Sequence, residues 1–244
     1  MSRSGEADDP RRRLLIQALA AGCFGTGMAT TGDALAQLLG GTPGKLPPGR
    51  SIYRLSGEVK VDGKPATIET PIGGRSTLET GRGAELVYAV GASAFVLRGD
   101  SRVVLETAQP ESTILTGLRL LSGKILSVFA ARRPMQLKAS TATIGIRGTG
   151  VYMEADPEQT YFCTCYGVAD IAANADPQSQ ETVAAQHHDR PLYIVKGEPA
   201  GRNIREAPFI NHTDQELMLI EALVGRTPPF VFPKSDYTGP RRNY

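Results

Sequence analysis

The chain has 244 residues, of which 41% are hydrophobic, 21% charged and 6% aromatic, so it can hold one large domain or two small ones. Its 27 basic and 25 acidic residues leave a formal net charge of +2, which excludes a strongly basic nucleic-acid binder and a polybasic membrane arm. The 27 glycines and 17 prolines favour a protein of many short strands joined by turns.

Residues 1–36 predict an export signal. Three arginines, Arg11 to Arg13, precede a weakly apolar run, and a small-residue pattern ends at Ala36, where we expect cleavage. The arginines resemble a twin-arginine signal, with an ordinary secretory signal as the alternative. An imperfect lipoprotein box ends at Cys23, so a lipid anchor there and a retained N-terminal anchor are further alternatives. We expect a periplasmic or exported protein with no integral membrane span in the mature chain, because no later stretch is long and apolar enough.

The body of the chain predicts a succession of short strands. Residues 37–50 are rich in glycine and proline and predict a linker. After them, apolar runs separated by glycine or proline predict strands at Ile52–Val61, Glu85–Val90, Ala94–Leu97, Val103–Leu105, Leu118–Leu121, Ile125–Phe129, Met135–Lys138, Thr143–Ile146, Val151–Met153, Tyr161–Cys165, Val168–Ile171 and Leu192–Val195. The pair Asp62-Gly63 predicts a hairpin turn. This pattern indicates a mainly β fold, as a sandwich, barrel or solenoid.

The C-terminal part predicts one helix over residues 213–225. Thr213 and Glu216 form a capping box, and an apolar run of about three turns follows them. Gly225 is a natural end for the helix, and two prolines beyond it prevent continuation. We expect the apolar face of this helix to pack on the β body.

Four segments, in this order, resemble the motifs of FecR domains: residues 78–87, 91–103, 121–126 and 143–152. The resemblance implies an extracytoplasmic domain of many short strands, sandwich-like or solenoid-like, over residues 51–172, with residues 173–244 as an extension. Proteins of that family relay a signal from an outer-membrane receptor to a cytoplasmic sigma factor through a membrane-spanning helix. Only about ten residues precede the signal here, so we expect a stand-alone exported domain, non-catalytic, that binds or senses an envelope protein or surface ligand.

The last FecR-like segment contains Gly145, Arg147, Gly148, Thr149 and Gly150. The resemblance implies a turn between two strands at this place. Glycines so closely spaced permit a positive φ or a close backbone approach, and the arginine can hydrogen-bond to neighbouring carbonyls. No helix start follows these glycines, so we interpret them as a structural turn and not as a phosphate-binding loop.

The cysteines and histidines are the sharpest chemical signal. Cys163 and Cys165 lie two residues apart, which on a strand places both thiols on one face. His187, His188 and His212 follow in the extension. Two thiolates and one or two imidazoles make a tetrahedral ligand set for zinc or copper. The first candidate set is Cys163, Cys165, His187 and His188.

Four other interpretations of these residues stay open. Cys163 and Cys165 can form a strained disulfide with each other, or remain reduced as small core residues. The histidines can be solvated loop residues, with His212 merely preceding the cap at Thr213. A cysteine nucleophile with His187 or His188 as its base is a third functional hypothesis. Because no catalytic sequence motif is present, we expect a non-enzymatic protein.

Overall fold

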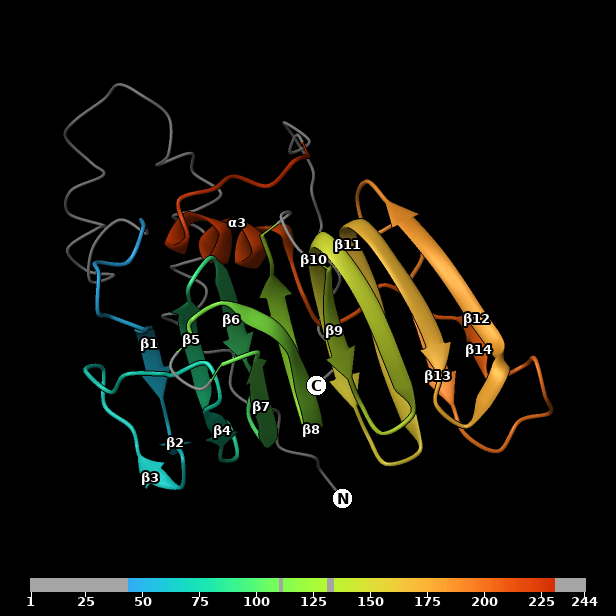
Figure 1. Cartoon of the computed structure of the whole chain (residues 1–244), viewed down its shortest axis with the longest axis horizontal. Helices are drawn as coiled ribbons and strands as arrows, with labels where there is room; N and C mark the ends of the chain where they lie inside the picture. Colours follow the sequence, from blue (N-terminus) through green and yellow to red (C-terminus); the bar gives the residue numbers. More distant parts are fainter. Residues whose placement is uncertain (1–43, 110–111, 131–133, 231–244) are drawn as a thin grey trace, which may run out of the picture.

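A computed structural model describes residues 44–109, 112–130 and 134–230. Nearly all regular structure there is β, and all fourteen strands belong to one sheet (Figure 1). The strands are β1 (Ile52–Ser56), β2 (Val59–Val61), β3 (Lys64–Pro65), β4 (Thr77–Thr80), β5 (Glu85–Val90), β6 (Ser93–Leu97), β7 (Ser101–Thr107), β8 (Leu115–Val128), β9 (Pro134–Lys138), β10 (Ala142–Ala155), β11 (Gln159–Ala173), β12 (Asp176–Ala185), β13 (Leu192–Val195) and β14 (Ile204–Glu206). One helix, α3 (Asp214–Leu223), follows them, so the predicted mainly β class with a C-terminal helix is confirmed.

Local sequence signals fix the first hairpins. Asp62 and Gly63 both have positive φ, 52° and 77°, and join β2 to β3 as predicted, because a tight hairpin turn of this kind needs two such residues. The strand predicted at Glu85–Val90 is β5, and Gly91 turns the chain from β5 into β6. These elements depend only on neighbours in sequence, which is why the sequence is sufficient to place them.

Three long strands give the sheet its shape. β8, β10 and β11 each pair with different neighbours along their two halves. Gly123, Gly148 and Gly167 lie near the points where the partners change, and all three have positive φ. Six of the predicted short strands therefore merge into three long ones, because these glycines bend a strand locally instead of ending it.

The predicted turn at Gly145, Arg147, Gly148, Thr149 and Gly150 lies inside β10, so it is not a reversal between two strands. The register with β11 shifts between Arg147 and Gly150, which is a β-bulge. At Gly150 the backbone of β10 lies close against the ring of Tyr166, and any side chain at this position would collide with that ring. The Arg147 side chain is exposed and pairs with Asp170 at 3.6 Å instead of bonding carbonyls.

Two separate apolar clusters fill the interior, one on each face of the central strands. On β5, Leu86 and Tyr88 belong to the main core cluster, whereas Val87 and Ala89 belong to the second cluster beneath α3. Successive side chains of a strand point to opposite faces, so strands buried on both sides read as continuous apolar runs. We call the second cluster, between the sheet and α3, the outer core.

Helix α3 lies across the sheet above β5, β6 and β8 (Figure 1). Its capping box at Thr213 and Glu216 is formed as predicted, and Gly225 follows the helix with φ of 73°. Leu217, Ile220 and Leu223 are fully buried against the outer core. The helix thus covers one face of the sheet and also brings the residues just before it onto β11.

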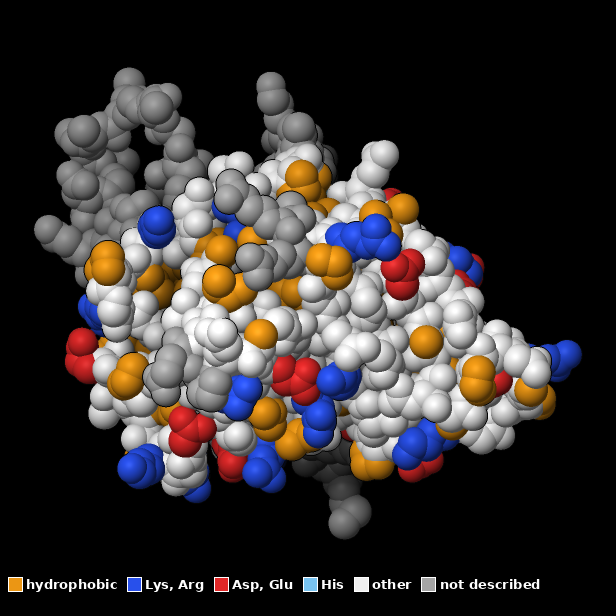
Figure 2. Space-filling view, in the orientation of Figure 1, with side chains coloured by type: hydrophobic (Ala, Val, Ile, Leu, Met, Phe, Trp, Pro, Cys, Tyr) orange, Lys and Arg blue, Asp and Glu red, His pale blue; other side chains and the backbone are white. Residues whose placement is uncertain are grey.

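The sheet continues past residue 172 without a break, since β12 pairs along β11 and β13 and β14 extend the same sheet. The predicted export signal lies outside the described residues. Within those residues, no helix has the length and apolar character needed to cross a membrane. Basic and acidic side chains are interspersed on the face shown in Figure 2, in keeping with the near-balanced charge.

Candidate metal centre

Cys163 and Cys165 are placed by β11. Both side chains point to the same face of the strand, as predicted, and lie in the outer core with no exposed surface. Both cysteines are free thiols in the structure. Because Cys163 is fully buried, no substrate can reach its sulfur in this conformation, which argues against a nucleophilic role.

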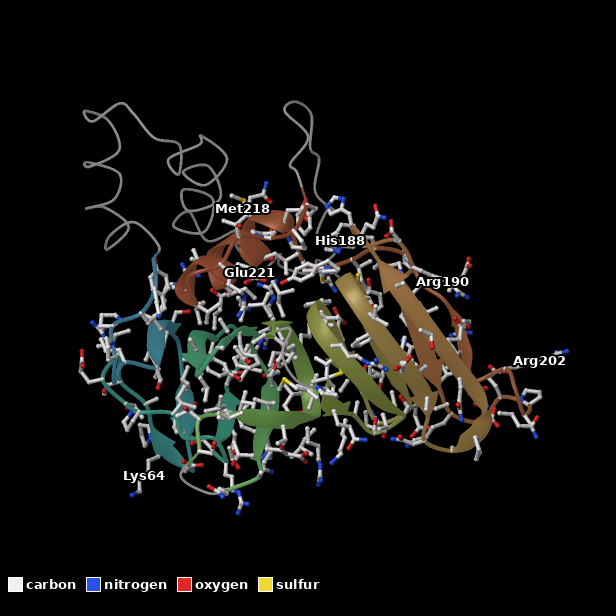
Figure 3. The ribbon with its side chains drawn as sticks, turned by 45° about the horizontal axis from the view of Figure 1, so that its top comes forward. Lys64, His188, Arg190, Arg202, Met218 and Glu221 are labelled. Carbon is white, nitrogen blue, oxygen red and sulfur yellow. The ribbon has the colours of Figure 1, made fainter. Side chains whose placement is uncertain are left out.

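His188 reaches the thiols from the turn between β12 and β13. Its backbone N–H donates to the Cys165 carbonyl at 2.9 Å, and its φ of 54° turns the side chain inward. The ring Nδ1 then lies 3.5 Å from the Cys163 sulfur. The ring also packs against the partly buried ring of Phe209, with centroids 4.3 Å apart. Figure 3 shows His188 close to α3.

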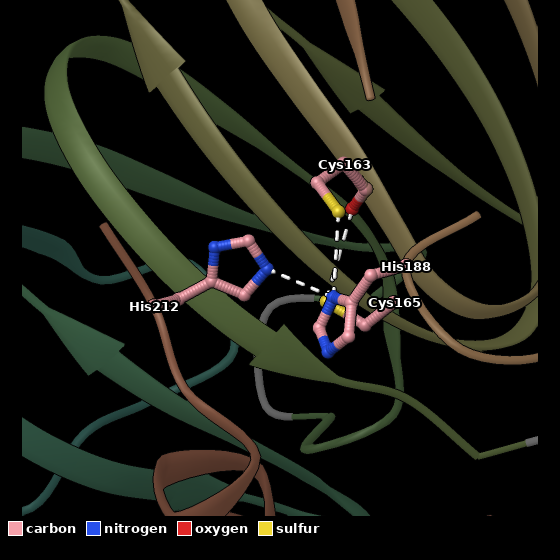
Figure 4. Close-up of side chains that lie close together, drawn as sticks. All are labelled: Cys163, Cys165, His188 and His212. Carbon is pink, nitrogen blue, oxygen red and sulfur yellow. Dashed lines mark hydrogen bonds between the residues drawn. The ribbon is translucent and has the colours of Figure 1, made fainter. Parts of the chain in front are cut away.

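His212 completes the cluster from the segment between β14 and α3. It directly precedes the N-cap Thr213, and its ring stacks on Tyr152 with centroids 4.4 Å apart. Its Nε2 lies 3.1 Å from Nδ1 of His188 (Figure 4). The side chain has no exposed surface.

The four ligand atoms of Cys163, Cys165, His188 and His212 all lie within 4.8 Å of one another. Zinc bonds of about 2.3 Å to sulfur and about 2.0 Å to nitrogen, at tetrahedral angles, require N–N and N–S separations of about 3.3 and 3.5 Å. The observed separations of 3.1 and 3.5 Å match these values. The cluster therefore has the size of a tetrahedral metal site.

The hydrogen bonds around the cluster aim both imidazoles at its centre. Nδ1 of His212 lies 2.7 Å from the Ile210 carbonyl, which only accepts, so this nitrogen carries the proton and Nε2 has the lone pair. Nε2 of His188 donates to the Asp214 carboxylate at 2.9 Å, which leaves the lone pair on Nδ1. Two lone pairs facing each other at 3.1 Å repel unless a proton or a metal ion lies between them.

In the absence of metal, the pKa values place a proton on His188. Burial opposes its charged form, but the hydrogen bonds to Asp214 and Cys163 outweigh burial and raise the pKa of His188 to about 9. Burial also opposes the thiolate of Cys163, yet its contacts with Cys165, His212 and His188 hold its pKa well below the ordinary value. Burial and the neighbouring Cys163 raise the pKa of Cys165 well above its usual range. When no metal is bound, the cluster thus holds a negative thiolate next to a positive imidazole, at the place where a cation would bind.

His187, which the sequence placed in the ligand set, lies outside the cluster. Its half-exposed ring points its Nε2 to Asp214 at 2.9 Å and contacts Phe230, with centroids 4.6 Å apart. The structure therefore brings together three of the four predicted ligands and adds His212. The sequence signal for His212 was its position directly before the capping box, which fixes the segment in space but does not say which strand it meets.

No family model matches the chain, and no curated protein matches it. Among solved structures, two crystal structures of a "putative anti-sigma factor" from Parabacteroides distasonis match part of the chain. The first is 12% identical with a TM-score of 0.42, and the match covers 54% of this chain and 58% of that chain. The second is 11% identical with a TM-score of 0.43, and the match covers 60% of this chain and 73% of that chain.

Proposed function

We propose that this chain is a metal-binding β domain of the cell envelope that holds one zinc ion through Cys163, Cys165, His188 and His212. The observation that carries the proposal is the convergence of four buried ligand atoms, with both imidazole lone pairs directed to one point. Two thiolates and two imidazoles in a tetrahedral arrangement are a usual structural zinc set. Copper(I) shares the preference for thiolates and is the competing ion.

A site with four protein ligands is closed. Catalytic zinc sites keep one position for water or substrate, whereas structural and regulatory sites fill all four with side chains. The burial of all four residues leaves no room for a substrate. The geometry therefore supports a binding or sensing role without turnover, as the FecR resemblance implies. The signal-like N-terminus supports a location in the envelope, where an envelope protein or surface ligand is the proposed partner.

The metal content of the purified protein tests this function. We would express the chain with its own N-terminus, purify it without chelators, and measure bound metals by mass spectrometry together with the number of reactive thiols. The expected result is about one zinc per chain and, with Cys23 removed in the cleaved signal, two thiols that become reactive only after metal removal. Cys163→Ser should lose the metal, and Thr164→Ser, on the same strand between the two cysteines, should keep it.

Two outcomes would contradict the proposal. A protein without metal and with two free thiols, even after zinc is supplied, has no site. A protein with neither metal nor reactive thiols contains the Cys163–Cys165 disulfide instead, since a disulfide and a thiolate site exclude each other. If copper is measured in place of zinc, the proposed site is correct and only the identity of the ion differs.

A further inference from the structure

The four ligands come from two layers of the molecule. Cys163 and Cys165 belong to β11 in the sheet, and His188 lies in the turn that follows β12. His212 belongs to the segment that covers the sheet, one residue before the cap of α3. A metal ion bound by all four would therefore bond the covering helix to the sheet beneath it.

The C-terminal layer, residues 207–230 including α3, covers an apolar face of the sheet. Leu217, Ile220 and Leu223 of α3 lie over Val96 and Leu126 of the outer core, and each of these five side chains is at most 2% exposed. A helix of ten residues is marginal in water when it stands alone. Its order must therefore come from docking, and if the layer detaches, this face of the sheet meets water.

The docking of α3 also buries three carboxylates. Asp214 contacts His188 and His187, Glu216 pairs with Arg98, and Glu221 is hydrogen-bonded by Tyr166. Buried charges lose hydration, which offsets much of the attraction between such pairs. These polar contacts consequently add little net free energy to docking, and a bond from the metal ion to His212 would add to the apolar contacts that hold the layer.

From this arrangement we infer that metal occupancy controls the docking of the C-terminal layer, residues 207–230, on the sheet. The inference rests on the metal site proposed above and assigns it a regulatory consequence. Only the docked layer offers His212 to the site, so the ion binds the docked state more tightly. An ion that binds one of two states shifts their equilibrium by a factor approaching 1 + [M]/Kd.

Hydrogen exchange of the full chain, followed by mass spectrometry, tests the coupling. We would compare zinc-loaded protein with protein treated with a chelator and a thiol reductant, and quantify zinc in the same samples. With free zinc at one hundred times Kd, amides of α3 should exchange about 100-fold more slowly than without zinc. Amides of the β2–β3 hairpin, whose last strand is exposed and ends the sheet on the side opposite β13 and β14, exchange by local opening and should do so equally in both samples.

The zinc measurement separates the two proposals. If one zinc is bound and α3 exchanges equally with and without it, the coupling is refuted and the metal site stands. If no zinc is bound, the metal site is refuted and the coupling with it. In the presence of zinc, Cys163→Ser should exchange like the chelated protein, and Thr164→Ser should not; the β7 amides report whether either variant has unfolded.

A second variant tests the coupling from the other side. Glu216→Gln weakens the pairing of α3 with Arg98 and leaves all four ligands in place. Because zinc favours the docked state by the same factor however strongly other contacts hold that state, zinc at one hundred times Kd should still slow α3 exchange about 100-fold in this variant. A Glu216→Gln protein in which α3 exchanges faster without zinc and is not slowed by bound zinc would overturn the inference.

Discussion

Asp214 touches no thiol, yet it determines which nitrogen of His188 faces the cluster. Its carboxylate accepts from Nε2 of His188 at 2.9 Å and from Nε2 of His187 at 2.9 Å. Outer partners of this kind typically contribute about 10- to 100-fold to metal affinity, because they fix the tautomer and ring orientation. Asp214→Asn should therefore weaken zinc binding by about that factor, as measured by competition with a chromophoric chelator.

The control for Asp214→Asn is Asp170→Asn, which changes a half-exposed carboxylate on the other half of β11. It should leave zinc affinity unchanged. Nitrogen NMR of the His188 ring adds a readout that is specific to orientation, because the Asp214→Asn protein should lose its single tautomer. If wild type and Asp214→Asn bind zinc with equal affinity while both are folded, Asp214 does not orient His188.

At the scale of elements, Arg98 anchors the start of α3 to the end of β6. Its guanidinium donates to both Glu216 oxygens at 3.1 and 3.0 Å and to the Asn211 carbonyl at 3.1 Å, and its side chain is 11% exposed. Removing one partner of such a pair leaves a buried charge, which costs about 3–5 kcal/mol. Arg98→Met should lower the free energy of unfolding by about 3 kcal/mol in urea titrations.

The control for this anchor is Arg102→Met. Arg102 is more than half exposed and pairs with Glu79 at 3.5 Å. Exposed pairs contribute at most about 1 kcal/mol, so the change should be small. Similar losses in the two variants would show that the Arg98 contacts add no more than an ordinary surface pair.

Asp176, the first residue of β12, joins the start of that strand to the segment between β13 and β14. Hydrogen bonds from Ser179, Asn203 and the Gly201 N–H lower the pKa of Asp176 from 3.8 to about 2. A lowered pKa in the folded state stabilises the fold above pH 3.8, and this contribution is lost as the pH falls through about 2. Asp176→Asn should therefore be less stable than wild type at pH 5 and lose less stability by pH 2.5.

Urea midpoints at the two pH values check the prediction for Asp176. The difference between wild type and variant should shrink on acidification. If the two proteins lose stability in parallel between pH 5 and 2.5, this carboxylate does not contribute to the acid sensitivity of the fold.

For the whole molecule, metal binding and folding are thermodynamically coupled. An ion that binds only the folded state at one hundred times its Kd adds about 2.7 kcal/mol, which for a domain of this size corresponds to about 5–10 °C in Tm. Calorimetry should show this increase with zinc. Magnesium at the same concentration should give none, because it prefers oxygen ligands. Equal effects of the two ions would point to general screening and not to the cysteine–histidine cluster.

The sequence by itself determined what depends on near neighbours in the chain. Alternating apolar runs and paired turn residues predicted the mainly β class, the Asp62-Gly63 hairpin and β5. The capping box predicted α3, and the two-residue spacing placed Cys163 and Cys165 on one face. Each of these features follows from backbone geometry within a few residues, so no knowledge of distant contacts was needed.

The tertiary structure alone decided the rest. Gly123, Gly148 and Gly167 were expected at strand ends, but pairing with different neighbours on each side keeps the three strands continuous through them. His212 enters the cluster, and His187 stays outside, because α3 docks across the outer core and carries the preceding residue onto β11. That docking depends on contacts between residues far apart in the chain, which local sequence patterns do not encode.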